Sequence, residues 1–211
     1  MRAIILSAGL GTRLKPLTNK KPKALVEVSG KPVIDHILWN LFQHGISEVI
    51  VNTHHKAKQI QEYLSNRVLY QYEPVLLGTA GSVKISAPWL ASGDPDGVFL
   101  VVNGDTLSNA DYTNLIEMHK SQNNTISELR DKKTDKNAGV YIIDFKATSA
   151  FPFIGMLDET ISLIAENFND ELKIQIPTKL YQGDLNWFDI GTFDNLKKAR
   201  QYYEKNNKLE A

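Results

Sequence analysis

A glycine-rich segment near the start of the chain has the composition of a phosphate-binding loop. Residues 9–14 (GLGTRL) directly follow a short apolar run. Two glycines in this position let backbone N–H groups approach a phosphate that side chains would otherwise obstruct. The positive charges of this region fall within eleven residues, at Arg13, Lys15, Lys20, Lys21 and Lys23. A loop that binds a polyphosphate needs such a cluster, so the segment predicts a nucleotide site, with a solvated basic loop as the alternative.

Two other nucleotide-binding motifs fit this segment poorly. The dinucleotide fingerprint requires a glycine where Leu14 stands and a helix that opens at once, whereas Pro16 and Pro22 are expected to keep this segment extended. The sequence contains no G-x-x-x-x-G-K-[S/T] run. A dehydrogenase and a P-loop nucleotide hydrolase are therefore both disfavoured.

A carboxylate at the end of a buried strand indicates a site for a divalent cation. Asp105 follows the apolar run 98–102 within residues 102–106 (VNGDT). In a doubly wound sheet, ligands bind at the carboxyl ends of strands where the connection order reverses. If this strand lies beside the first one, Asp105 faces the phosphates and can hold a hard cation through oxygen. An aspartate in an ordinary strand-end turn is the alternative.

The order of these residues resembles the signature of sugar-1-phosphate nucleotidylyltransferases, also called nucleotide-sugar pyrophosphorylases. The resemblance rests on residues 9–18 (GLGTRLKPLT) and 21–25 (KPKAL), and four further blocks match in the family's order. It therefore covers nearly the whole chain and implies a Rossmann-like nucleotidyltransferase fold. The implied reaction joins an NTP to a sugar 1-phosphate, giving an NDP-sugar and pyrophosphate. The compact chain is nearer to the short guanylyl- and uridylyltransferases for mannose, heptose or N-acetylmuramate phosphates than to two-domain acetyltransferase fusions.

The resemblance assigns roles to the nucleotide side of the site. Residues 73–82 (EPVLLGTAGS) resemble a base-recognition segment, in which a glycine backbone contacts the base and an upstream Glu or Gln reads its edge. The implied nucleotide-binding residues are Leu6, Ala8, Gly9, Gly11, Thr12, Glu73, Gly78, Thr79 and Asn103. The implied catalytic residues are Arg13, which stabilises the departing pyrophosphate, and Lys23, which stabilises charge at the α-phosphate. Residues 186–192 (NWFDIGT) resemble the closing motif, so Asp189 and Asp105 are the implied Mg²⁺ ligands.

The sugar side of the resemblance is less complete. Residues 126–132 (ISELRDK) look like a worn Glu-Lys pair in which Asp131 replaces the glutamate, and residues 137–141 (NAGVY) match the sugar-pocket segment. A strand and a turn usual in the family are missing between residues 111 and 137. The implied sugar-phosphate ligands are Asp131, Lys132, Asn137 and Gly139, with a plain charged loop as the alternative for the first two.

Glu73 also indicates which base the site accepts, because thymidylyl-type members usually have a glutamine there. An ionised carboxylate only accepts hydrogen bonds, so it suits bases with N–H donors on the pairing edge. Guanine offers two such donors, uracil and thymine one, and adenine presents an acceptor. GTP or UTP is therefore expected above dTTP and CTP, with ATP last. Glu73→Gln should narrow the gap between GTP and dTTP by roughly 1 to 3 kcal/mol if the side chain reads the base edge.

The elements that must position these residues follow an alternating pattern. Short β-branched runs alternate with amphipathic stretches, which favours parallel strands joined by crossover helices. The expected strands are residues 3–6, 49–51, 68–72, 98–102, 138–143 and 173–176. The expected helices are residues 32–45, 57–64, 79–90 and 112–119, the last capped by Asp111, and a final helix capped by Thr192. The prediction is one α/β domain over residues 1–211, with a mixed, mostly parallel sheet flanked by helices.

Composition narrows the possible partners. Lys+Arg and Asp+Glu stand at 24 each, so no net charge favours nucleic acid or an anionic membrane. The absence of cysteine excludes disulfides and thiolate chemistry. The first apolar run is too short for a signal-peptide core, and a cytoplasmic location is expected. The alternatives are a non-catalytic nucleotide-sugar sensor of the same fold, a metal-dependent glycosyltransferase, and a non-sugar phosphate acceptor. The base, the sugar and the oligomeric state, including a homodimer, stay open.

Overall fold

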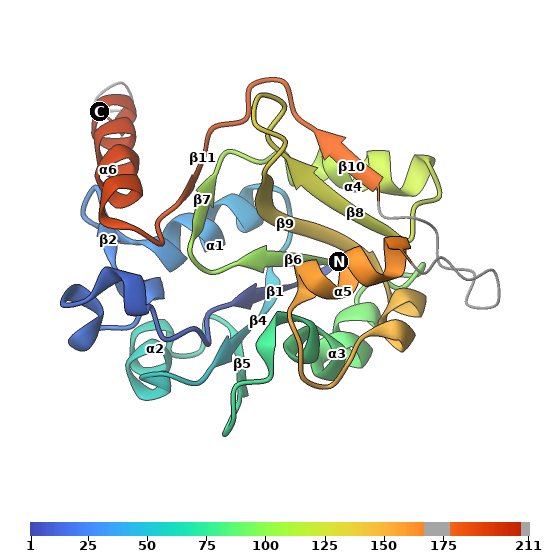
Figure 1. The fold of residues 1–211 in the computed structure, drawn as a ribbon, viewed down its shortest axis with the longest axis horizontal. Helices are drawn as coiled ribbons and strands as arrows, with labels where there is room; N and C mark the ends of the chain where they lie inside the picture. The colour runs from blue at the N-terminus through green and yellow to red at the C-terminus, as the bar shows by residue number, and fades with distance from the viewer. Residues whose placement is uncertain (167–177, 208–211) are drawn as a thin grey trace.

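A mixed seven-stranded sheet forms the centre of the computed structural model, which describes residues 1–166 and 178–207 (Figure 1). Its strands run in the order β10-β8-β9-β6-β1-β4-β5. Their bounds are β1 Arg2–Leu6, β4 Glu48–Thr53, β5 Leu69–Tyr72, β6 Val98–Asn103, β8 Ile126–Arg130, β9 Asn137–Asp144 and β10 Thr178–Tyr181. Only β9 runs antiparallel to its neighbours β6 and β8. The predicted mostly parallel sheet is confirmed, whereas the strand expected at 173–176 lies outside the described residues.

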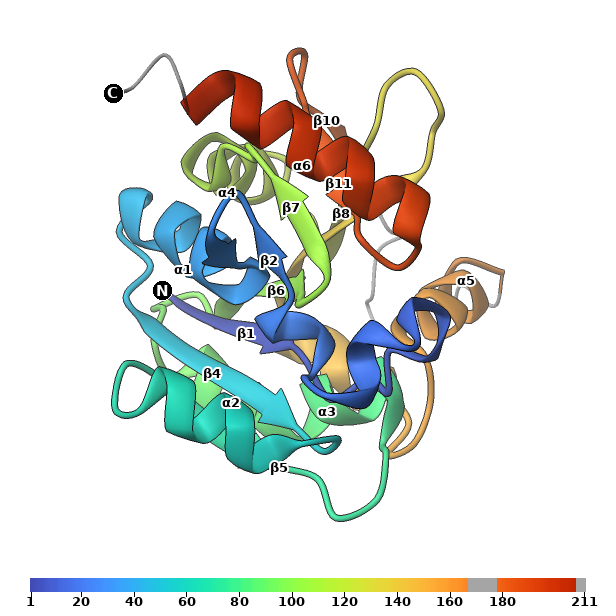
Figure 2. The same cartoon turned by 90° about the vertical axis from the view of Figure 1, so that its left-hand side faces the viewer.

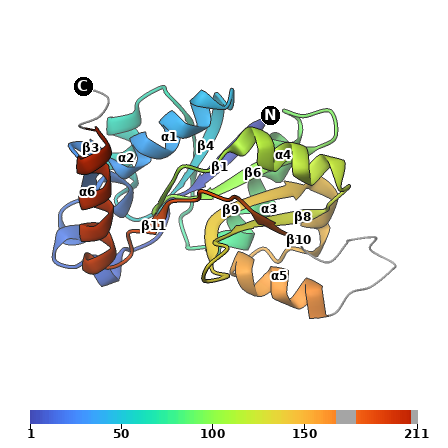
Figure 3. The same ribbon diagram turned by 90° about the horizontal axis from the view of Figure 1, so that it is seen from above.

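Helices cover both faces of this sheet and bury two apolar cores. They are α1 Val33–Gln43, α2 Ala57–Leu64, α3 Gly78–Ala91, α4 Tyr112–Ser121, α5 Leu157–Glu166 and α6 Phe193–Asn207. Ala3 and Ile5 of β1 belong to the core that α1, α2, α4 and α6 share, whereas Ile4 belongs to the core beneath α3 and α5. Figure 3 shows α4 and α5 on opposite faces of the sheet. Because β1 and β6 are buried on both sides, they read as continuous apolar runs.

The helix boundaries have local causes. The turn after α1 ends at Gly45, whose φ of 72° favours glycine, and the N–H of Ile46 bonds to the carbonyl of Leu41 at 3.0 Å. Asp111 accepts from the N–H of Asn114 at 3.0 Å and so caps α4, as predicted. Thr192 caps α6 in the same way through Asn195. Within the described ranges, no helix combines the length and apolar content needed to cross a membrane.

Two small ladders lie outside the main sheet. One pairs β2 (Glu27–Val28) with β3 (Lys31–Pro32), and the other pairs β7 (Thr106–Ser108) with β11 (Trp187–Asp189). The β7–β11 ladder lies beneath α6 (Figure 2). It is antiparallel and sets Asp189 opposite Thr106. Segments far apart in the sequence therefore meet beside the end of β6.

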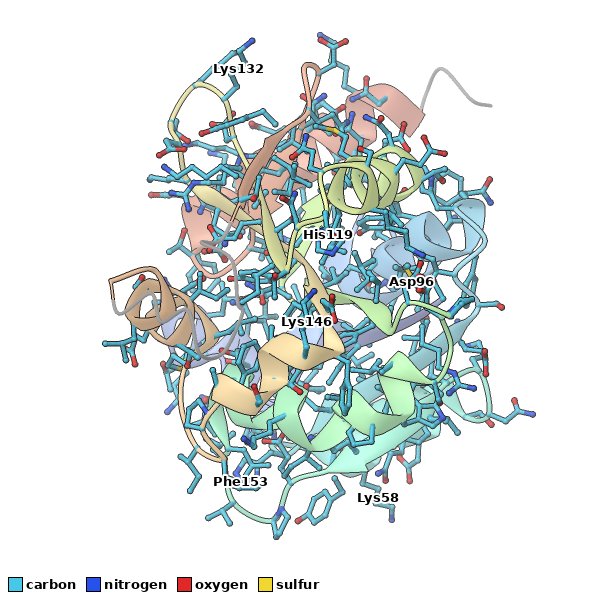
Figure 4. The ribbon with its side chains drawn as sticks, turned by 90° about the vertical axis from the view of Figure 1, so that its right-hand side faces the viewer. Lys58, Asp96, His119, Lys132, Lys146 and Phe153 are labelled. Carbon is cyan, nitrogen blue, oxygen red and sulfur yellow. The ribbon has the colours of Figure 1, made fainter. Side chains whose placement is uncertain are left out.

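A buried histidine of α4 faces β8, away from these loops. His119 is 1% exposed, its Nδ1 lies 2.8 Å from the hydroxyl of Ser127, and its Nε2 has no hydrogen-bond partner (Figure 4). Burial disfavours the charged imidazolium, although the nearby Asp144 carboxylate opposes this effect. The net result is a pKa of His119 lowered to about 4.

Acid should therefore destabilise the fold through His119. In the unfolded chain a histidine takes up a proton near pH 6.5, whereas His119 in the fold does so only near pH 4. Through this group, the free energy of unfolding should therefore be unchanged above pH 6.5 and should fall by about 3 kcal/mol as the pH drops from 6.5 to 4. His119→Gln keeps a side chain that can bond to Ser127 but cannot titrate. Urea unfolding at stepped pH values should show a shallower pH dependence in this variant, and equal slopes for the two proteins would contradict the assignment.

Candidate active site

A cavity of about 420 Å³ opens at the carboxyl ends of β1, β4 and β6. β1 lies between β4 and β6 in the sheet, so the connections from it reverse direction here, where doubly wound sheets bind ligands. The lining residues are Leu6, Ala8, Gly9, Asn52, Glu73, Leu76, Gly78, Thr79, Ser82, Asn103, Asp105 and Met156. Most of the predicted nucleotide-binding residues are among them, but Gly11 and Thr12 are not. A larger hollow of about 630 Å³ between α1 and α6 contains none of the predicted residues.

The glycine loop turns sharply at Gly11. Its φ is 64°, and a Cβ there would lie 2.9 Å from the Cγ2 of Thr18, so both conformation and space require glycine. The hydroxyl of Thr18 donates to the carbonyl of Gly11 at 2.8 Å. The expectation of an extended segment after this point is wrong. Three short 3-10 turns, at Thr12–Leu14, Leu17–Asn19 and Lys23–Leu25, fold the basic loop back on itself, and the two prolines lie between them.

The third of these turns carries Lys23 to the predicted carboxylates. The Nζ of Lys23 donates to Oδ2 of Asp105 and lies 3.9 Å from Oδ1 of Asp189. The β7–β11 ladder brings the two aspartates together, because the N–H of Ile190 bonds to the carbonyl of Asp105 at 3.0 Å. Gly104 packs against the end of β1, where its N–H bonds to the carbonyl of Leu6 at 2.9 Å. The structure thus joins three sequence-distant predicted residues in one cluster at the cavity.

Arg13 completes this cluster of charges. A Cβ on Gly191 would lie 2.7 Å from Nη2 of Arg13 and 2.8 Å from Oδ1 of Asp189, so the guanidinium lies close against the closing motif at this glycine. The N–H of Gly191 also bonds to Oδ1 of Asp189 at 2.7 Å. The cluster is open to solvent, since the side chains of Asp105 and Asp189 are 31% and 38% exposed.

The two carboxylates suit a magnesium ion whose coordination is completed by water and by oxygens of the substrate. Across residues 1–166 and 178–207, no group of three or more His, Asp or Glu side chains could enclose a metal. Mg²⁺ is commonly held by one or two carboxylates, with water and substrate phosphates supplying its other oxygens. Asp105 and Asp189, facing the same ammonium group, fit that pattern.

Glu73 lines the end of the cavity next to α3 but is held by internal donors. Its Oε1 accepts from Nδ2 of Asn52 at 2.9 Å, from the hydroxyl of Ser82 at 2.6 Å and from Nε2 of Gln71 at 3.2 Å. Its Oε2 accepts from the N–H of Leu77 at 3.2 Å. Each carboxylate oxygen has about two acceptor positions. One position on Oε2 is left for a ligand, so a bidentate contact with guanine through both oxygens has no free acceptor on Oε1.

A second segment packs over the end of the cavity next to α3. The N–H of Gly155 bonds to the carbonyl of Leu77 at 2.8 Å, and its carbonyl accepts from Ala80 at 2.9 Å. A Cβ on Gly78, whose φ is 71°, would lie 2.3 Å from the carbonyl oxygen of Gly155. The hydroxyl of Thr79 accepts from the N–H of Leu157 at 2.6 Å. These bonds bring Met156 into the cavity wall, which no sequence pattern predicted.

The predicted sugar-phosphate ligands separate into two groups. Gly139 lies beside the cavity, because a Cβ on it would come 3.0 Å from Nδ2 of Asn103. Asn137 accepts from the N–H of Gly139 at 2.6 Å and reaches toward Asp158. Asp131 and Lys132 instead lie in the loop between β8 and β9, and neither lines the cavity. Figure 4 shows Lys132 at the outer end of this loop.

Asp131 has a structural partner in that loop. Its carboxylate accepts from the hydroxyl of Thr134 at 2.6 Å and from the N–H of Lys133 at 3.3 Å. The bond from Thr134 is the main cause of a lowered pKa of Asp131. Asp131 is thus held within its own loop, and its contact with a sugar phosphate stays a prediction.

The chain is similar to known proteins in both sequence and fold. The profile of a family described as "Nucleotidyl transferase" matches residues 2–148. The bifunctional protein GlmU of Staphylococcus epidermidis is 40% identical over 129 residues, which are 60% of this chain and 28% of that protein. The N-acetylmuramate alpha-1-phosphate uridylyltransferase of Neisseria meningitidis is 41% identical over 120 residues, 54% of this chain and 50% of that one. The chain thus spans about a quarter to a half of the length of these relatives.

Solved structures match over almost the whole chain. HddC from Yersinia pseudotuberculosis, in a complex with GMP-PN, superposes with a TM-score of 0.73 at 23% identity, covering 96% of this chain and 99% of that one. A UDP-glucose pyrophosphorylase from Acinetobacter baumannii gives a TM-score of 0.74 at 17% identity, covering 96% and 92%. At such identities the likeness shows that the fold is shared.

Proposed function

Since the chain belongs to the nucleotidyl transferase family, we propose that it transfers a nucleotidyl group from an NTP to a sugar 1-phosphate. The observation that carries this proposal is the cluster of Lys23, Asp105, Asp189 and Arg13 at the mouth of the glycine-loop cavity. Cations and cation-binding carboxylates beside a nucleotide cavity suit phosphoryl chemistry, which depends on alignment and charge neutralisation. The name of the N-acetylmuramate alpha-1-phosphate uridylyltransferase relative supports the same reaction class.

In the proposed reaction, an oxygen of the sugar phosphate attacks the α-phosphorus in line, and the bond to the β-phosphate oxygen breaks to release pyrophosphate. No protein nucleophile is needed. Lys23 would stabilise charge that grows at the α-phosphate, and Arg13 would stabilise the departing pyrophosphate. Asp105 and Asp189 would hold Mg²⁺, which when bound neutralises phosphate oxygens. Asn137 and Gly139 would contact the sugar phosphate. The reaction consumes NTPs, which are present in the cytoplasm, so the proposal includes a cytoplasmic location.

The base preference is proposed from the free acceptor on Glu73. One acceptor position on Oε2 suits a base that presents an N–H on its pairing edge, such as guanine or uracil. Adenine would place its N1 acceptor against a carboxylate and should bind worst. Thymine presents the same N–H as uracil, so the lower rank of dTTP rests on the resemblance, in which thymidylyl-type members usually have a glutamine at this position. We therefore propose GTP or UTP as the donor, ahead of dTTP and CTP.

A substrate panel tests the proposal directly. Five NTPs are combined with several sugar 1-phosphates and Mg²⁺, and released pyrophosphate is measured. We expect release only with both substrates and Mg²⁺, fastest with GTP or UTP and slowest with ATP. Nucleotide-sugar binding without turnover would instead indicate a sensor. A separate incubation with NDP-sugars and sugar acceptors tests the glycosyltransferase alternative, which a glycosylated acceptor would indicate. ATP as the best donor would overturn the assignment of Glu73.

A further inference from the structure

Asn52 is a buried side chain with all four of its hydrogen-bonding positions occupied. It lies near the end of β4, opposite Leu6 of the neighbouring β1, and is 3% exposed. Its Oδ1 accepts from the N–H of Ser7 at 2.5 Å and from that of Ala8 at 3.3 Å. These are the backbone groups with which the chain leaves β1 to enter the glycine loop. The start of the phosphate-binding loop is therefore fixed by a side chain from another strand.

The other end of the same amide reaches the base-binding segment. Nδ2 of Asn52 donates to Oε1 of Glu73 at 2.9 Å and to the hydroxyl of Ser82 at 3.0 Å. Glu73 in turn holds the N–H of Leu77, directly before α3. A chain of buried hydrogen bonds thus runs from the glycine loop to the start of α3. Buried polar networks in which every member is satisfied favour one arrangement of the backbone.

We propose that Asn52 is a positioning residue that holds the phosphate-binding loop and the base-binding segment in one fixed relation. The inference rests on the proposed nucleotide site, and it gives Glu73 a second role as an anchor for both segments. The orientation of the amide is determined, because Oδ1 must face two N–H donors and Nδ2 must face a carboxylate. Preorganised loops bind their ligand without having to be ordered first.

Exchanging the amide of position 52 and the carboxylate of position 73 tests this link. Asn52→Asp keeps the acceptor for Ser7 and Ala8 but sets a second negative charge against Glu73. Glu73→Gln removes the negative charge that Nδ2 of Asn52 faces. In the double variant N52D/E73Q, the amide introduced at position 73 can donate to the carboxylate introduced at position 52, so the hydrogen bond returns with its polarity reversed. General damage to the fold would not be repaired by adding a second substitution.

GTP and UTP are titrated separately into each variant by calorimetry, without sugar phosphate. For whichever binds the unaltered protein more tightly, we expect N52D to bind at least tenfold more weakly and N52D/E73Q to recover at least tenfold. Asn124→Asp is the matched control, since Asn124 is also buried and hydrogen-bonded but lies beside β8. Wild-type affinity in N52D, equal loss in the control, or a double variant no better than N52D would overturn the proposal.

A nucleotide-free measurement separates this proposal from the proposed function. Asn52→Ala removes the acceptor for Ser7 and Ala8 without adding charge, and it replaces N52D if that variant does not fold. We expect amide hydrogen exchange of Ser7, Ala8 and Leu77, whose N–H groups are held by this network, to quicken at least tenfold relative to the exchange of β6. Unchanged exchange there would contradict the role of Asn52 even if the protein is a nucleotidyltransferase. Quickened exchange in a protein that binds neither NTP would support the loop link and reject the nucleotide assignment.

Discussion

Asp105→Asn is expected to lower kcat/KM for pyrophosphate release by at least ~100-fold, the scale on which a preorganised charge stabiliser matters. The substitution keeps the size of the side chain and removes one of the two negative oxygen donors that face Lys23. A neutral amide oxygen is a poorer ligand for Mg²⁺ than a carboxylate. Stability should change little, because the amide oxygen can still accept from Nζ of Lys23 in this partly exposed pair. Pyrophosphate release as a function of Mg²⁺ concentration measures the effect.

Asp96→Asn serves as the matched control for this experiment. Asp96 is an exposed aspartate in the turn before β6, where Lys120 binds both it and Asp94. Its substitution makes the same chemical change outside the cavity and should leave turnover unaltered. Near-normal Mg²⁺-dependent activity in Asp105→Asn would rule out the metal-ligand role, whereas an equal loss in both variants would point to a general effect.

The central strands and their helices were predictable from local sequence. Continuous apolar runs at 3–6 and 98–102 indicated strands buried on both faces, and the structure places β1 and β6 side by side there. Gly45 and Asp111 marked helix ends through backbone conformation and capping, which depend on few neighbours. α3 extends through Ser86 and Pro88, because Ser86 bonds to Gln71 on β5 and Ala87 packs in the core.

The missed strand β8 shows where local patterning fails. Its residues Ser127 and Glu128 are buried although they are polar, and such a run does not read as a core strand. Ser127 bonds to His119 of α4, whereas Glu128 pairs with Arg130 of the same strand at 2.8 Å. Pairing with β9 and β10 on its two sides places β8 in the sheet. The three-residue strands β7 and β11 are too short for any period to show. Tertiary contacts decide all three elements.

The residues of the candidate site also differ in how far the sequence could predict them. The motif residues Lys23, Asp105 and Asp189 could be named from the sequence because each belongs to an ordered block of residues. Asn52 could have been noticed as a polar residue directly after an apolar run, but its partners on neighbouring segments depend on strand order. Met156 enters the cavity only through backbone bonds of Gly155, which leave no trace in the pattern of side chains.

Lys23→Ala is expected to lower kcat by about 100-fold and to raise KM for the NTP much less, if Lys23 acts mainly on charge that develops in the transition state. Its side chain is only 13% exposed and its ammonium group is already directed at the cavity mouth by Asp105. Because that position is fixed before substrate arrives, little reorganisation is needed when negative charge grows at the α-phosphate. Steady-state rates of pyrophosphate release over a range of NTP concentrations separate the two constants.

Two outcomes would give Lys23 a different role. A rise in KM with unchanged kcat would mean that Lys23 binds the ground state and the transition state equally well. Unchanged values of both constants would mean that its contact with Asp105 serves only to balance charge. Lys58→Ala is the control, because Lys58 is exposed on α2, where it faces Glu62 at 3.7 Å (Figure 4). Removing this positive charge changes the net charge of the protein equally, so any difference between the variants reports the position of Lys23 at the cavity.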